Sequence, residues 1–161
     1  GSAQHLAGAY FEQVTGVKLL HVPYRGGGPA MTDVMGGQVP LFFANVASAL
    51  PHIQSGRLRP LAVTAKQHCK ALPEIPTMAE VGVPPEYEVL EWNPVLAPAG
   101  VSAEVKDDLV KAIRHAMDDA EVRKRIEAMG GERFDGDPAA FLKTQQALWA
   151  GVVREHGITR D

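Results

Sequence analysis

Three places in the sequence carry groups that could bind a small anion. Tyr24 and Arg25 precede a run of three glycines, and Asn45 follows an apolar stretch, directly before a helical pattern. Ser2 stands in a similar place, where the first helical pattern begins. Hydroxyl, amide and backbone N–H groups at helix starts can hold a carboxylate, because the free N–H groups and the helix dipole favour negative charge. These residue types do not supply a nucleophile paired with a base.

Each of these residues also has a purely structural interpretation. The triglycine run resembles a phosphate loop, but no Lys-Ser/Thr pair accompanies it, so a turn that lets the backbone approach a ligand is the simpler interpretation. Asn45 and Ser2 could act only as helix caps. Trp92 could be a core aromatic residue or the wall of a cleft.

Composition excludes several classes of function. The chain has 161 residues and a net charge of −3, whereas nucleic-acid binders normally carry a basic surplus. One cysteine, Cys69, rules out an internal disulfide and a cysteine-rich zinc site, and the six histidines show no HExxH spacing. No GxSxG motif is present. We therefore expect no metal, no cofactor and no nucleic-acid partner.

Apolar spacing in the first half predicts the elements that position the candidate residues. Helical patterns cover residues 2–15, 30–35 and 46–55, and short apolar strands cover 18–24, 38–45 and 58–65. This alternation predicts an α/β fold with a mostly parallel sheet covered on both faces. Ligands of such sheets bind beyond the carboxyl ends of the strands, so Ser2, the glycine turn and Asn45 should converge.

The second half is predicted to be helical. An extended connector at 86–98 leads into helices at 103–118, 119–129 and 138–155. Asp118 with Glu121 forms a capping-box pattern for the middle helix. The connector is typical of a crossing between two bodies, and we divide the chain into residues 1–90 and 91–161.

Several segments resemble the Bug/TctC family, the extracytoplasmic solute-binding receptors of tripartite tricarboxylate transporters. The specific parts are HVPYRGGGPA and SALPHIQSGRLRPLAVT, and the resemblance continues through LPEIPTMAEVG, EWNPVLAPAGVSAEV and DAEVRKRIEAMGGE. It implies a periplasmic-binding-protein-like (Venus-flytrap) clamp. It also implies that a small carboxylate is held between two lobes: a di- or tricarboxylate, an amino acid or an aromatic acid. Helix N-termini, backbone amides and ordered waters would make the contacts.

The resemblance assigns ligand-binding positions to particular residues. They are Ser2, Ala3 and Gln4 at the first helix start, Tyr24, Arg25 and Gly26 in the glycine turn, Asn45, and Trp92 at the crossing. The sequence departs from the family after the tryptophan. Asn93-Pro94 stand where an aromatic residue and a glycine are common, so the wall at the hinge can differ.

The resemblance also implies a setting for the chain. It implies a non-catalytic receptor in the periplasm whose partners are the membrane components of the transporter. Residues 1–90 would form most of the second lobe, and residues 91–161 the crossing and the C-terminal part of the first lobe. The export signal and most of the first lobe would lie outside this chain, and Gly1-Ser2 would be native sequence or an expression-tag scar.

Two consequences and two rival functions follow from this interpretation. The apolar faces of helices 103–118 and 138–155 need a cover, for which a second copy of the chain in a homodimer is one candidate. Ligand binding by this chain alone is expected to be weak or absent. The rivals are a small hydrolase-like α/β enzyme and a nucleotide-binding module built on the glycines at 26–28.

Overall fold

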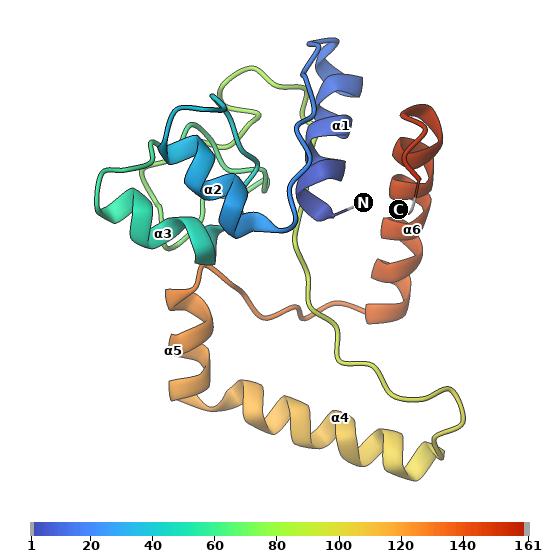
Figure 1. The fold of residues 1–161 in the computed structure, drawn as a ribbon. Helices are drawn as coiled ribbons and strands as arrows, with labels where there is room; N and C mark the ends of the chain where they lie inside the picture. Colours follow the sequence, from blue (N-terminus) through green and yellow to red (C-terminus); the bar gives the residue numbers. More distant parts are fainter. Residues whose placement is uncertain (1, 160–161) are drawn as a thin grey trace.

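The computed structural model describes residues 2–159, and it is helical wherever it is regular. The helices are α1 (Ala3–Thr15), α2 (Gly27–Met35), α3 (Val46–Gln54), α4 (Ala103–Asp118), α5 (Ala120–Ala128) and α6 (Pro138–Glu155). In Figure 1, α1, α2 and α3 form one body with the irregular chain that follows them, α6 lies beside α1, and α4 and α5 form a separate arm. No helix within residues 2–159 has the length and apolar character needed to cross a bilayer.

Local signals explain where the helices begin and end. Ser2 caps α1 by accepting a hydrogen bond from the N–H of His5 at 3.3 Å, and Gly16 ends the helix in a left-handed conformation with φ of 72°. The helix α2 begins at Gly27, earlier than predicted, so two of the three glycines form its first turn. The predicted cap Asp118 is wrong by one residue. Asp119 caps α5, because its carboxylate accepts hydrogen bonds from the N–H groups of the first helical turn.

The predicted parallel sheet is not formed by residues 2–159. Segments 18–24, 38–45 and 58–65 are irregular and make no ladder, and the described residues contain two isolated bridges, Val63 with Thr77 and Cys69 with Leu72. A strand needs a neighbour along its edge, and these segments run beside helices and irregular chain instead. Apolar side chains of the segments consequently stay exposed, such as Leu20 at 91% and Leu61 at 55%.

The core lies between α1, α6 and the beginning of the connector. The rings of Tyr10 and Tyr87 stack with their centroids 5.4 Å apart, and Trp149 of α6 meets Tyr10 edge-on at 6.0 Å. The Tyr87 hydroxyl donates to the carbonyl of Ala7 at 3.0 Å. Since Tyr87 is only 3% exposed, this bond fixes the start of the connector against α1.

The arm formed by α4 and α5 has no buried residue on either helix. The chain returns to the first body directly after α5, where Gly130 lies against Val46 of α3 and next to Cys69. Lys70 pairs with Glu127 of α5 at 3.3 Å. The arm is therefore held at its α5 end, while α4 extends away from the core (Figure 1).

Candidate functional site

The start of α1 presents backbone N–H groups at the surface. Ser2 and Ala3 are exposed and Gln4 is half-buried. The first N–H groups of any α-helix have no acceptor within the helix, and the Ser2 hydroxyl satisfies only that of His5. The N–H groups of Ala3 and Gln4 are thus placed to meet an anion. The structure confirms Ser2 as a cap and leaves room for a ligand contact at the next two positions.

The glycine turn forms the start of α2. Gly26 is the residue before the helix and has φ of 112°, a conformation that strains any residue with a Cβ. Because glycine has no side chain, the first N–H groups of α2 receive no side-chain cap. Tyr24 is fixed by a 2.8 Å hydrogen bond from its hydroxyl to Asp33 on α2, which raises the pKa of Tyr24. Arg25 is exposed, and within residues 2–159 it makes no ion pair.

Asn45 is the cap of α3 and also a bridge to the connector. Its side-chain oxygen accepts a hydrogen bond from the N–H of Ala47 at 2.8 Å. Its side-chain nitrogen donates to the carboxylate of Glu91, which lies 46 residues later. The cap interpretation of Asn45 is therefore confirmed. The second contact shows that the amide can donate to a carboxylate without leaving the helix it caps.

The Trp92 side chain lies outside the core and is only partly exposed to solvent. It is 38% exposed, and its ring meets Phe141 edge-on, with centroids 5.7 Å apart and planes at 85°. Phe141 lies in the first turn of α6 and also contacts Phe134 at 4.9 Å. Trp92 therefore sits where the connector, α6 and the chain leading to α6 meet, next to the Glu91 that holds Asn45.

The helix starts share one side of the first body. In Figure 1, the first turns of α1, α2 and α3 face the side from which the connector leaves. This side is called the rim, and it is defined by helix starts rather than by strand ends (Figure 1). The convergence of Ser2, the glycine turn and Asn45 on it stays a prediction. The contact between Asn45 and Glu91 is the direct link between this rim and the connector.

Two residues near this rim were missed by sequence reasoning. The only feature of the sequence that pointed to Glu91 was its position directly before Trp92. His21 stacks on His5 with ring centroids 3.9 Å apart and planes at 10°. The two histidines stand 16 positions apart in the sequence, and no helical or strand spacing predicts the pair. Among residues 2–159 no group of three or more His, Cys, Asp or Glu side chains could hold a metal ion.

An open hollow of mixed charge lies away from this rim, between α5 and the chain that follows it. Lys70, Arg123 and Arg133 line it together with acidic residues. Arg133 pairs with Asp118 and Asp135, and Lys70 pairs with Glu127. Asp118, Glu127, Glu132 and Asp135 line the hollow beside these three cations, so it offers no surplus of positive charge to an anion.

Comparison with known proteins places the chain among transport receptors. The family model described as "Tripartite tricarboxylate transporter family receptor" (TctC) matches residues 1–158. Protein BugT of Bordetella pertussis is 36% identical over 160 residues, which cover 98% of this chain and 49% of that protein. A protein from the clcB-clcD intergenic region of Pseudomonas knackmussii is 34% identical, with 99% of this chain and 89% of that protein covered.

Solved structures agree with the sequence comparison. The R. palustris protein Rpa4515, solved with adipate, matches with a TM-score of 0.85 and 32% identity, covering 99% of this chain and 54% of that one. The periplasmic binding protein BugD matches with a TM-score of 0.82 and 33% identity, covering 99% and 55%. The periplasmic-binding-protein-like fold is thus confirmed at the level of overall architecture, without the predicted sheet.

The chain spans about half the length of BugT and of these two solved structures. The family match nevertheless extends over nearly every residue, and it includes the helix starts, the glycine turn and the connector described above. The predicted resemblance is confirmed: this chain belongs to the TctC family, the receptors of tripartite tricarboxylate transporters.

Proposed function

We propose that this chain is part of an extracytoplasmic receptor that captures a small carboxylate for a tripartite tricarboxylate transporter. The observation that carries the proposal is the side-chain amide of Asn45, which caps α3 and also donates to the carboxylate of Glu91. A relative with 32% identity was solved with adipate, a dicarboxylate, which supports the same ligand class here. The receptor binds and releases its ligand without catalysis.

The proposed contacts use polar atoms rather than reactive side chains. Backbone N–H groups of Ala3 and Gln4 and of the turn at Gly26 donate to carboxylate oxygens. The Asn45 side-chain nitrogen, which already donates to Glu91, would donate to the ligand in the same way. Such donors are fixed by the helices that carry them, so little conformational entropy is lost when the ligand binds.

Three other residues complete the proposed site. Arg25 carries a positive charge that can pair with a second carboxylate, and Tyr24 holds the glycine turn against α2. Trp92 forms an apolar wall on the connector. Together they favour a ligand with charged ends and an apolar middle.

We further propose how the chain fits the complete receptor. Residues 1–90 belong to the second lobe of the clamp, and residues 91–161 to the crossing and the C-terminal part of the first lobe. The receptor works in the periplasm, where it meets the membrane components of the transporter. Adding the rest of the clamp would complete the ligand cleft, so this chain alone should bind weakly.

Asn45→Ala tests the proposed site in a receptor extended to the length of its curated relatives. A thermal-shift panel would compare adipate with other mono-, di- and tricarboxylates, and would include nucleotides. The ligand-induced rise in Tm should be smaller for the variant than for the wild type, each measured against its own ligand-free Tm. Removing the helix cap itself lowers stability by about 1 kcal/mol. Measuring each protein against its own ligand-free Tm excludes this effect from the comparison.

Ser55→Ala is the matched control, because Ser55 ends the same helix α3 away from the rim. Its ligand-induced shift should equal that of the wild type. Equal shifts for Asn45→Ala and the wild type would remove Asn45 from the site. A shift with nucleotides and none with carboxylates would contradict the proposed function.

A further inference from the structure

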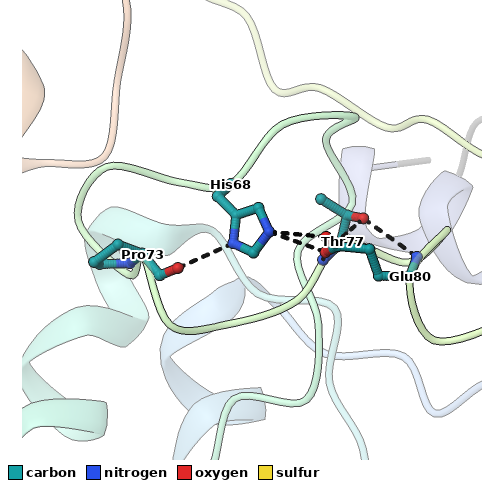
Figure 2. A network of polar contacts seen from close by, with 4 residues as sticks. All are labelled: His68, Pro73, Thr77 and Glu80. Atoms are coloured by element: carbon teal, nitrogen blue, oxygen red, sulfur yellow. Dashed lines mark hydrogen bonds and ion pairs between the residues drawn. The ribbon is translucent and has the colours of Figure 1, made fainter.

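The segment from 66 to 82 contains a compact polar network that the proposed site does not use. The segment is irregular, and its second half is tied back to Val63, which lies three residues before the segment begins. Val63 donates to the carbonyl of Pro76 at 2.8 Å and accepts from the N–H of Met78 at 3.0 Å. The segment is therefore a loop closed at its base, and His68 lies inside its curve (Figure 2).

Both ring nitrogens of His68 face acceptor oxygens. Nδ1 lies 3.0 Å from the carbonyl oxygen of Pro73, and Nε2 lies 3.1 Å and 3.0 Å from the two carboxylate oxygens of Glu80 (Figure 2). A neutral imidazole carries one N–H and can satisfy only one of these acceptors, whereas an imidazolium donates from both nitrogens. The geometry therefore fits the protonated ring.

Glu80 is held in place independently of the histidine. Its carboxylate accepts from the Thr77 N–H at 2.7 Å and from the Thr77 hydroxyl at 3.1 Å, and the Glu80 N–H donates back to that hydroxyl at 3.3 Å. This reciprocal pair has the form of a capping box. Thr77 is only 4% exposed, so its hydrogen bonds hold the Glu80 carboxylate in place. The His68 ring contacts a carboxylate whose position does not depend on it.

No other charged group competes for the ring. The neighbouring lysines face elsewhere, because Lys66 pairs with Glu88 at 3.5 Å and Lys70 with Glu127 at 3.3 Å. Within the described chain, Glu80 is the charged group that faces His68, and the carbonyls of Pro73 and Ile75 complete its surroundings. The protonation state of His68 thus decides whether its ring hydrogen-bonds the Pro73 carbonyl and the Glu80 carboxylate at the same time.

We propose that His68 is a protonation-dependent latch, which closes the 66–82 segment when its ring is charged and releases it when the ring is neutral. The released segment includes Cys69 and Lys70, the residues next to Gly130 and Glu127 at the α5 end of the arm. The latch consequently controls how firmly the arm is held to the first body.

The pKa directions define the pH window of the latch. The hydrogen bond to Glu80 and the Pro73 carbonyl raise the pKa of His68, so the contact is complete below the ordinary histidine pKa and is lost as pH rises through the raised value. Hydrogen bonds from Thr77 and His68 lower the pKa of Glu80, so the contact is lost in acid only as pH falls through that lowered value. Between these limits the latch is closed.

Two measurements on the same protein test the latch. NMR titration follows the ring signals of His68 and of His115, an exposed histidine on α4. Hydrogen exchange between about pH 5 and 9, corrected for the intrinsic pH dependence of exchange, follows the amides of Leu72 and Ile75, whose acceptors lie inside the segment. The pKa of His68 should lie above the ordinary histidine value, and protection of the two amides should fall as His68 loses its proton.

Three variants separate the latch from general stability. Glu80→Gln should lower the pKa of His68 toward the ordinary histidine value and remove the pH dependence of protection. His68→Arg keeps a charge at every pH of the experiment, so protection should stay constant as pH rises. His115→Gln is the control and should behave as the wild type. The proposal is overturned if the pKa of His68 is the same in the wild type and in Glu80→Gln, or if wild-type protection is unchanged while His68 titrates.

Discussion

Asn45 and His68 both make side-chain contacts that only the folded chain reveals. The cap role of Asn45 follows from its place before a helical pattern, since capping depends on residues two or three positions away. Its bond to Glu91 spans 46 residues and therefore could not be predicted from local sequence. The same holds for His68, whose value as a latch depends on the fold of the segment around it.

Tyr87 gives the clearest stability prediction at this scale. Its hydroxyl bonds the Ala7 carbonyl inside the core, and burial raises its pKa from the ordinary value of 10.0. Tyr87→Phe should cost about 1 kcal/mol of unfolding free energy in a urea titration, because it removes a buried hydrogen bond. Tyr24→Phe, at a half-buried surface position, should cost less.

The same tyrosine makes stability depend on alkaline pH. A raised pKa in the folded state means that the unfolded chain ionises first, so the stabilising effect is complete below about pH 10 and is lost as pH rises further. Tyr87→Phe should reduce this alkaline loss. An alkaline slope equal in the wild type and in Tyr87→Phe would show that Tyr87 is not its source.

Helices and extended segments differ in how far the sequence predicts them. Every helix of the structure was expected, because caps, glycine stops and apolar spacing act within a few residues. The segments at 18–24, 38–45 and 58–65 were predicted as strands but form no sheet with one another among residues 2–159, because pairing depends on neighbours distant in sequence. The candidate site stays a prediction, and its proposed donors lie at helix starts rather than in the predicted strands.

Two glycines in helices test the account of these elements. Gly16 ends α1 with φ of 72°, so Gly16→Ala should destabilise the protein by about 1 kcal/mol. Gly151 lies inside α6 with open space around it, so Gly151→Ala should stabilise by about 0.5–1 kcal/mol through higher helix propensity. Paired urea titrations measure both, and shifts of the same sign would refute this interpretation of the two positions.

The whole molecule consists of a packed body and an arm that leaves apolar surface uncovered. A crossing between two bodies at 86–98 was predicted from the extended pattern, and the connector does leave the core there (Figure 1). The return of the chain to α3 at Gly130 was not predicted, because it rests on a contact between residues more than 80 positions apart. The position of the arm relative to the first body depends on long-range packing, which cannot be predicted from the periodicity of the sequence.

The face of α4 gives a prediction about association. Val105, Leu109 and Ile113 share that face and are 47%, 44% and 37% exposed. Exposed apolar surface of this kind favours a second copy of the chain, so the mass from light scattering should rise with concentration. Leu109→Lys should reduce the rise, whereas Lys106→Gln should not. A constant monomer mass at high concentration would contradict self-association.

Titration calorimetry with a matched pair of ligands tests the carboxylate site most directly. Adipate and its uncharged diamide have the same length, so they differ mainly in the charge that helix N–H groups and Arg25 would recognise. A receptor extended to the length of its curated relatives should bind the diacid, and this chain alone should bind it more weakly. The diamide should give no measurable heat of binding. Equal affinity for adipate and the diamide would show that fixed donors at the helix starts do not select a carboxylate.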